Sequence, residues 1–476
     1  MHFPTASDHK AKEILHLKER ENRGMNGILS PNLFDDLPEE LIMEIFSFIS
    51  LKELCLTIPL VCKKWKDFAA SPLLWQHLDF NEIKCLTTKA LYNIICMKCP
   101  LLKRLSLKYR SELSAYEMLN IAKACPQLQQ LSLAFCGQIN EKIVTMFAEY
   151  FPDLQDINLE GCDITDGCIN DLSILPLKRI SVSHCVHLSN DSLKTIATSC
   201  SHLQSINFDG IQWITDDAVY VMVEYCHAHL EKLWLDGANL TDNSIQAIAN
   251  CINLKVFSLS FCDNLSDVTL TWIKQMKKLQ TLRLKKGINF TAKVLQELFI
   301  GLHVDLMDNA TGILYLYLPE CSNMNDEAVK SLAERYFLCM HLLPKTFLPH
   351  ISISNFMFKL DYTRFKDSIQ HFLLLSSFPN LLELDLSWCW DITDQGFINV
   401  VLNCNEMQSM IMCGMREIMG NCLLNLPKLM PRLRYLDASQ CNKMSDQLLL
   451  ELVNTVKNLT VLNYYCEILR PYAFNK

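Results

Sequence analysis

The chain has 476 residues, half of them hydrophobic, so it can bury a sizeable core without disulfide bonds. Its formal net charge of -8, with both signs interspersed, disfavours nucleic acid or an anionic membrane as its partner. The first residues lack an apolar stretch of signal-peptide length, and the most apolar segment, near 338–360, is interrupted by prolines and lysines. We therefore expect a globular protein of the cytoplasm and/or nucleus, without a membrane span.

Residues 1–33 differ from the rest of the chain. Their charged stretch "HKAKEILHLKERENR" is compatible with a frayed helix, and its nearly balanced charges disfavour a nuclear-import signal. We expect a flexible N-terminal tail.

Residues 34–80 predict a small module of three helices. The first helix carries apolar residues at helical spacing, with a proline and two glutamates in its first turn: Leu37, Leu41, Ile45 and Phe48. A second helix follows Ser50, and a third segment places three large residues on one side: Val61, Trp65 and Phe68. Because fewer than about 50 residues cannot bury all these side chains internally, we expect Leu37, Ile45 and Trp65 to face a partner.

From residue 81 to 476 the chain repeats the pattern LxxLxLxxC. Examples are "LQQLSLAFC" at 128, "LQDINLEGC" at 154 and "LLELDLSWC" at 381, and the pattern recurs in about fourteen units. One unit, at 348, is degenerate, the spacing widens near 300–380, and the last unit, near 459, fits a C-terminal cap. The alternating leucines predict a short strand with one buried face.

The second half of many units predicts a helix. A hydroxyl residue followed by aspartate precedes an amphipathic stretch, a typical helix start, at Thr165–Asp166, Thr215–Asp216, Thr241–Asp242, Ser266–Asp267, Thr393–Asp394 and Ser445–Asp446. A single strand–helix unit cannot bury its own apolar face, so the units must stack into a curved solenoid with a parallel sheet on its concave side. We expect the repeat cysteines to be buried, reduced thiols, for example Cys136, Cys162, Cys262, Cys389 and Cys441.

Two local patterns resemble reactive sites, and both have a simpler interpretation. Cys96 and Cys99 form a CxxC, but no second pair lies at zinc-site spacing. His184, Cys185 and His187 are close in sequence, yet Cys185 is the repeat cysteine. We therefore predict no catalytic residue, no metal site and no cofactor.

The segments "LPEELIMEIFSFI", "LVCKKWKDFA" and "LLWQHLDF" resemble the three blocks of an F-box, and with the repeats the chain is similar to the F-box and leucine-rich-repeat family. The resemblance implies an α/β fold, with a three-helix F-box ahead of a cysteine-containing leucine-rich-repeat solenoid. It also implies a set of adaptor-binding positions: Leu37, Pro38, Glu40, Leu41, Ile45, Phe46, Val61, Cys62, Trp65 and Trp75. Some of these are expected to serve internal packing.

In that family the F-box docks on a Skp-type adaptor, which is bound to a cullin and its RING subunit, and the repeats hold the protein to be ubiquitinated. The resemblance thus implies a non-catalytic substrate receptor of an SCF-type ubiquitin ligase. Two alternatives remain open: a non-degradative scaffold for a cytoskeletal or signalling partner, and a repeat-type inhibitor that occludes an enzyme.

The residues that flank the inner leucines predict a substrate site on the concave face. A large aromatic lies between acidic and basic positions in the set Asp209, Trp234, Asp236, Phe261, Arg283, Lys285, Lys286, Tyr317 and Trp388. This composition suits a peptide or protein better than a nucleic acid. The alternatives are that these are merely solvated strand residues, or that the long loops between 300 and 380 recognise the substrate.

Overall fold

The computed structural model describes residues 37–80, 87–110, 112–302, 312–333, 378, 380–421, 423 and 426–471. The predicted tail at 1–33, the degenerate unit at 348 and most of the irregular segment near 300–380 lie outside the described residues. The chain divides into two compact units, Met1–His187 and Leu188–Lys476, here called unit 1 and unit 2. No helix in the described part is long and apolar enough to cross a membrane.

Unit 1 begins with the predicted small helical module. Pro38 precedes the first helix, and the Ser50 hydroxyl accepts a 3.3 Å hydrogen bond from the backbone N–H of Glu53 at the start of the second. The elements of the module are α2 (Glu39–Ser47), α3 (Leu51–Leu56), the 3-10 helix η1 (Ile58–Leu60), α4 (Lys63–Ala69) and the 3-10 helix η2 (Pro72–Trp75).

The rest of unit 1 alternates strands and helices. Its strands pair in parallel and in order, with leucine or isoleucine in register at the buried central position, as in the pair Leu105↔Leu131. The first strand comes directly after the helical module, and its Leu78 pairs with Leu105. The elements are β1 (His77–Asp79), α5 (Thr88–Lys98), β2 (Arg104–Ser106), α6 (Ala115–Ala124), β3 (Gln130–Ser132), α7 (Glu141–Tyr150), β4 (Asp156–Asn158), α8 (Asp166–Leu172) and β5 (Arg179–Ser181).

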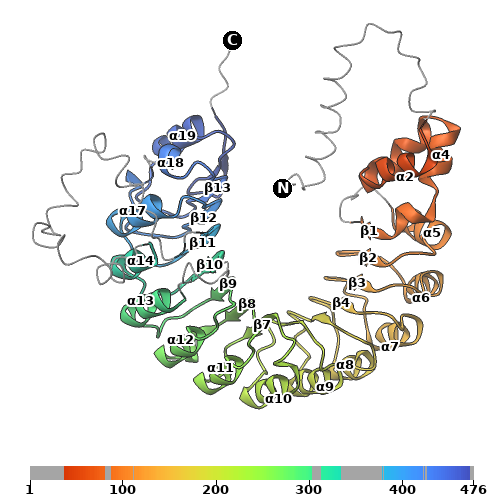
Figure 1. Cartoon of the computed structure of the whole chain (residues 1–476), viewed down its shortest axis with the longest axis horizontal. Coiled ribbons are helices and arrows are strands. Elements are labelled where there is room, and N and C mark those ends of the chain that lie inside the picture. Colours follow the sequence, from red (N-terminus) through yellow and green to blue (C-terminus); the bar gives the residue numbers. More distant parts are fainter. Residues whose placement is uncertain are drawn as a thin grey trace, which may run out of the picture. The chain divides into compact units, whose positions relative to one another are not determined.

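The first part of unit 2 has the same architecture, with the strands on one face and the helices on the other (Figure 1). Strands β6 to β10 pair in parallel. The elements are α9 (Asn190–Ser199), β6 (Ser205–Phe208), α10 (Asp216–Cys226), β7 (Lys232–Asp236), α11 (Asp242–Ile248), β8 (Val256–Ser260), η4 (Cys262–Asn264), α12 (Asp267–Ile273), β9 (Thr281–Leu284), α13 (Ala292–Gly301), β10 (Tyr315–Tyr317) and α14 (Asp326–Ala333).

The second part of unit 2 continues the sheet. Strand β10 is bonded directly to β11, with Leu316 opposite Leu384, although many residues separate them in sequence. The last strand, β15, runs antiparallel to β14 and closes the sheet, with Val461 opposite Leu469. The elements are β11 (Glu383–Asp385), α17 (Asp394–Asn403), β12 (Ser409–Ile411), α18 (Leu426–Leu429), β13 (Tyr435–Asp437), α19 (Asp446–Thr455), β14 (Thr460–Leu462) and β15 (Ile468–Leu469). The predicted α/β repeat architecture with a parallel sheet is confirmed.

The repeat cysteines connect neighbouring repeats. The five cysteines predicted to be core residues are all buried and reduced. Several thiols donate to a carbonyl of the preceding repeat: Cys162 Sγ lies 3.1 Å from Leu133 O, and Cys441 Sγ lies 3.0 Å from Met412 O. Burial raises the pKa of the Cys162 thiol to about 12. These cysteines therefore act as small apolar residues that also satisfy a buried carbonyl.

The six predicted helix starts are confirmed, since α8, α10, α11, α12, α17 and α19 each begin at the aspartate of the pair. In four of them the preceding hydroxyl accepts a backbone N–H, as Thr241 does from Asn243 at 3.3 Å. Thr165 and Thr215 make no such bond. The backbone around the pair, and not the hydroxyl bond alone, sets the helix start.

In unit 2 the aspartate also bonds to the next repeat. Asp216 accepts the backbone N–H of Thr241 at 2.9 Å and its hydroxyl at 2.5 Å. Asp242 accepts the backbone N–H of Ser266 at 3.0 Å, and Asp267 accepts the backbone N–H of Thr291 at 2.7 Å. The same bond joins repeats across the longest sequence gap, since Asp326 accepts the N–H of Thr393 at 2.7 Å. We call these four carboxylates, Asp216, Asp242, Asp267 and Asp326, the aspartate ladder.

Many strands are followed, one to three residues later, by a residue with left-handed backbone geometry. In unit 1 Tyr109 and Phe135 have φ values of 60° and 59°, and their rings stack in parallel with centroids 5.0 Å apart. The next position in this column is Gly161, with φ 64°, where a Cβ atom would lie 2.6 Å from the Phe135 ring. Glycine is therefore required at this position both by the backbone conformation and by the close approach of the ring.

Candidate protein-binding surfaces

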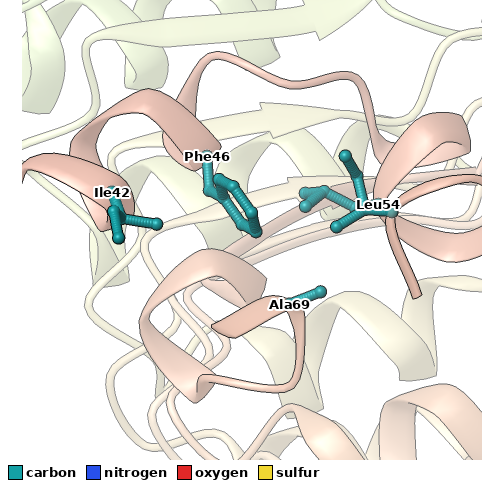
Figure 2. Close-up of a cluster of buried hydrophobic side chains, with 5 residues drawn as sticks. Ile42, Phe46, Leu54 and Ala69 are labelled. Carbon is teal, nitrogen blue, oxygen red and sulfur yellow. The ribbon is translucent and has the colours of Figure 1, made fainter. Parts of the chain in front are cut away.

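The helical module has a small core of its own. Ile42 and Phe46 of α2 pack with Leu54, Ile58 and Ala69, all of them buried (Figure 2). Two aromatic rings of α4 meet the Phe46 ring edge to face, at centroid distances of 5.5 Å for Trp65 and 6.1 Å for Phe68. This packing fixes α2 against α4 and determines which side chains remain outside.

One apolar stripe of α2 stays exposed. Leu41, Ile45 and Phe48 are 46%, 38% and 48% exposed, and their spacing of four and three residues places them on one helical face. A second exposed pair lies at the end of η1, where Leu60 is 84% exposed beside the exposed Val61. We call Leu41, Ile45 and Phe48 the α2 stripe.

The predicted adaptor-binding residues fall into three groups. Leu37 and Trp65 are partly buried against the core of the module, so only part of each side chain is open to a partner. Phe46 and Trp75 are buried, so they support the surface from within. The remaining predicted residues are exposed: Pro38, Glu40, Leu41, Ile45, Val61 and Cys62.

Trp75 is buried because it joins the module to the first repeat. Its indole N–H donates to the Ala69 carbonyl at 2.8 Å, and Lys98 of α5 lies over its ring, with Nζ 5.2 Å from the centroid.

Sequence reasoning missed Phe48 and Leu60 as surface residues. Phe48 had a signal, since it continues the apolar spacing of α2, whereas the exposure of Leu60 depends on how η1 turns.

Cys62 has a structural role as well as an exposed position. Its sulfur accepts the backbone N–H of Trp65 at 3.4 Å and so caps the start of α4. This bond orders the turn that carries Leu60 and Val61.

The second candidate surface is the strand face, defined as the sheet surface formed by the side chains that alternate with the buried leucines. Four residues of the predicted substrate site lie on or beside it. Trp234 on β7 and Tyr317 on β10 are half-buried, Arg283 on β9 is exposed, and Asp209 comes directly after β6. The strand register places Arg283 opposite Tyr317.

Other residues of the predicted substrate site have different roles. Asp236 is only 1% exposed, and its Oδ1 accepts the N–H of Ala238 at 2.9 Å, so it serves its own turn. Phe261, Lys286 and Trp388 are not strand-face residues, because they have φ values of 56°, 61° and 61° after the strands end.

Side-chain contacts already occupy this edge of the sheet. Lys286 lies over the Phe261 ring, with Nζ 4.3 Å from the centroid. Lys285 forms an ion pair with Glu320 at 3.5 Å. The edge is therefore less available to a partner than the sequence suggested.

The sequence pattern also placed Asp385 on the strand face, but sequence reasoning passed over three of its neighbours on β11 and β13. These are Glu383, Tyr435 and Asp437, which occupy strand-face positions. The Tyr317 hydroxyl donates to Glu383 Oε2 at 2.6 Å, and burial together with this carboxylate raises the pKa of Tyr317. A signal was present, because these residues flank the inner leucine just as Trp234 does.

The two patterns that resemble reactive sites have packing roles. Cys185 is buried, its Sγ donates to Leu159 O at 3.1 Å, and burial raises its pKa to about 12, so it is a poor nucleophile. His187 lies 3.4 Å from Asp163, and Cys99 is buried with its Sγ 3.4 Å from Ile94 O. In the part of the chain that the structure describes, no group of three or more potential ligands could hold a metal ion.

Comparison with known proteins agrees with this architecture. An F-box-like family model matches residues 34–81, and a leucine-rich-repeat model matches residues 379–399. A chain in the crystal structure of the Rad7 and Elc1 complex in yeast is similar over 97% of this chain and 98% of its own length, with a TM-score of 0.60 and 16% identity. At this identity the likeness shows the fold.

A second solved structure, the tropomodulin C-terminal domain from Caenorhabditis elegans, covers 29% of this chain and 91% of its own, with a TM-score of 0.25 and 13% identity. This weaker likeness supports no conclusion. The chain therefore combines an F-box-like domain at residues 34–81 with a leucine-rich repeat at residues 379–399.

Proposed function

We propose that this chain is the non-catalytic substrate receptor of an SCF-type ubiquitin ligase, active in the cytoplasm and/or nucleus. Its F-box docks on a Skp-type adaptor bound to cullin and RING subunits, and its repeats bind the protein to be ubiquitinated. The α2 stripe is the observation that carries the proposal, because it exposes three apolar side chains along one face of a module that has a packed core of its own.

The proposal refines the adaptor-binding site. The exposed residues of the predicted set bind the adaptor directly, and Phe48 and Leu60 join them. Leu37, Phe46, Trp65 and Trp75 hold this surface in shape. The similar solved structure is a complex of Rad7 with Elc1, and it supports the idea that this fold works with a second protein.

For the substrate we propose the strand face, with Trp234 as an apolar anchor and with Arg283 and Tyr317 among its contacts. Trp234, Arg283 and Tyr317 are exposed or half-buried side chains on short, paired strands, so the scaffold holds them in place before a partner arrives. Such preorganisation reduces the entropy lost on binding.

The test is copurification with the Skp-type adaptor and cullin, comparing the wild type with Ile45→Asp and Leu41→Asp. A charge in the centre of an apolar interface removes about 2 kcal/mol or more of binding energy, so each variant should lose most of the adaptor. The matched control is Ile252→Asp, which places the same charge at an exposed isoleucine of unit 2 and should copurify normally.

Undiminished adaptor capture by both stripe variants would contradict the docking proposal. Proteins captured by the repeats should accumulate when the proteasome is blocked, and in the Ile45→Asp variant this increase should disappear. Partners whose abundance is unaffected by the block would instead favour a non-degradative scaffold.

A further inference from the structure

One part of the strand face differs from the rest in its composition. Strands β10 to β13 pair in register, so that Tyr317, Asp385, Ile411 and Asp437 form a single row across the sheet. Neighbouring strands lie about 4.8 Å apart, which places the two aspartates on either side of Ile411, about 10 Å from each other. With the adjacent row, this gives a surface that we call the acidic–tyrosine face: Tyr317, Glu383, Asp385, Ile411, Tyr435 and Asp437.

Hydrogen bonds hold the carboxylates of this face in place. Oδ1 of Asp385 accepts the N–H of Ser387 at 2.9 Å and its hydroxyl at 2.6 Å. Oδ1 of Asp437 accepts the N–H of Ser439 at 2.9 Å. Both aspartates thus use one oxygen to fix their own turn, and the described residues give Oδ2 of Asp385 no hydrogen bond. These carboxylates are oriented acceptors that need little rearrangement to bind a donor.

The face carries an unbalanced negative charge. The strand-face residues within β10 to β14 include Glu383, Asp385 and Asp437 but no lysine, arginine or histidine. Arg283, on β9, borders the row next to Tyr317. Burial raises the pKa of Asp385, while its bonds to Ser387 and the charge of Arg283 oppose the shift and Asp437 adds to it. A cationic partner would relieve this repulsion.

The side chains between the carboxylates are apolar or aromatic. Ile411 and Tyr435 are half-buried, so part of each remains open to contact. A metal ion does not fit the arrangement, because among the described residues no group of three or more potential ligands is placed to hold one. A long basic side chain does fit, since it combines an aliphatic stem with a terminal donor group.

We propose that the acidic–tyrosine face binds a basic peptide segment of the partner protein, with an arginine or lysine side chain over Ile411 between Asp385 and Asp437. The methylene stem contacts Ile411, the terminal cation donates to the carboxylates, and the tyrosine rings border it. The inference rests on the proposed function in one respect, because it takes this partner to be the protein that is ubiquitinated. The binding itself needs no adaptor.

The experiment uses the full-length protein and a positional library of immobilised ten-residue peptides, in which each position in turn is fixed as one amino acid. Arginine and lysine should be enriched, and acidic residues depleted. The affinity of the best peptide is then measured by fluorescence anisotropy, and it should fall as salt is raised. Because no adaptor is present, failure of F-box docking in the copurification experiment leaves this result intact.

The variants Asp385→Asn and Asp437→Asn remove one charge each and retain an oxygen for the turn. Each should weaken binding about 10-fold, and Ile411→Lys, which places a cation inside the site, should abolish it. The matched control is the double variant Glu149→Gln with Asp153→Asn, which removes two charges from exposed positions of unit 1 and should bind like the wild type.

Enrichment of acidic peptides, or unchanged affinity in both aspartate variants, would overturn the proposal. Thermal unfolding of each variant separates loss of the site from loss of the fold. If an asparagine variant does not fold, Ile411→Lys and the salt dependence of the wild type decide the question. Self-association of the wild type that is lost in Asp385→Asn, without basic-peptide binding, would assign the face to a second copy of the chain.

Discussion

Units 1 and 2 build the same repeat but stabilise it at different places. In unit 2 the aspartate ladder bonds the helix starts of successive repeats to one another, as from Asp242 to Ser266. In unit 1 several helix starts are capped by a residue of the same repeat, for example by the reciprocal Ser114–Glu117 capping box of α6. Side-chain contacts between repeats there include the stack of Tyr109 on Phe135 after the strands and the bond from the Thr145 hydroxyl to Asp171 on the helix side.

The difference shows that one repeat motif permits several kinds of contact between neighbours. Cysteine thiols donate to the preceding repeat in both units, as at Cys162 and Cys441. The additional contacts depend on the residues at the end of each strand and at the start of each helix. Four predictions test this comparison, beginning with the largest expected effect.

The first prediction tests whether the F-box core belongs to unit 1 alone. Phe46→Ala removes a fully buried ring and should lower the free energy of unfolding of the module by about 3–5 kcal/mol. So small a core should unfold after a loss of this size. Hydrogen exchange should show lost protection in α2 to α4 and unchanged protection in β6 to β14. Phe48→Ala, on the exposed side of the same helix, serves as the control and should leave α2 protected. Lost protection in unit 2 would show that the two units unfold together.

The second prediction tests the aspartate ladder. Asp242→Ala removes the acceptor of the Ser266 N–H, the Ser266 hydroxyl and the Thr269 hydroxyl. Chemical denaturation of unit 2 should show a loss of about 2 kcal/mol at neutral pH. The control is Glu141→Ala, at the first position of α7 in unit 1, which should cost less than about 0.5 kcal/mol.

The effect of Asp242→Ala should depend on pH. Burial acts to raise the pKa of Asp242, but the hydrogen bonds from Ser266 and Thr269 outweigh it and hold the pKa below the usual 3.8. Since the folded pKa is lower than the unfolded one, the carboxylate stabilises the fold above about pH 4, and this contribution is lost as the pH falls through the folded pKa. A difference between variant and wild type that stays constant down to about pH 2 would contradict the assignment.

The third prediction concerns the aromatic stack of unit 1. In a double-mutant cycle of Tyr109→Ala and Phe135→Ala, measured by denaturant unfolding, the coupling energy should be about 1 kcal/mol. The same cycle with Tyr116→Ala, an exposed tyrosine on α6, in place of Tyr109→Ala should give no coupling. Equal coupling in both cycles would mean that the stack does not join the two repeats.

The fourth prediction expects almost no change in stability. Cys466 is exposed, so Cys466→Ser should alter the free energy of unfolding by less than about 0.5 kcal/mol. In the native protein Cys466 and Cys62 should react quickly with iodoacetamide, whereas buried Cys162 and Cys389 should react only after unfolding. Mass spectrometry of alkylated peptides checks this. Fast native labelling of Cys162 would contradict its position in the repeat core.

Local patterns predicted much of the fold. Alternating leucines marked the strands, and Thr–Asp or Ser–Asp pairs marked the helix starts, because both signals depend only on neighbouring residues. The bond from Asp242 to Ser266 was not predicted, since it joins residues 24 positions apart and needs the stacking of repeats to be known. The local pattern assigned the aspartate to the start of its own helix. It did not reveal the second role of the aspartate, which is to accept a hydrogen bond from the next repeat.

The binding surfaces were harder to predict because motif positions do not reveal exposure. Phe46 and Trp75 match the F-box blocks, yet the first is the centre of a core and the second lies beneath α5. Similarly, Phe261 and Trp388 follow the strand pattern, but they come after their strands have ended, at positions with left-handed backbone geometry. In each case the deciding fact is a tertiary contact or a backbone angle that the pattern does not contain.

The pairing of β1 with β2 has a mechanical consequence. Since β1 comes directly after η2, the F-box is bonded into the sheet of unit 1 and is not tethered by a loose linker. The indole of Trp75 and the chain at Leu78 would have to leave the interior before the module could swivel. A partner bound to the α2 stripe would therefore be held at a set angle to the first repeats of unit 1.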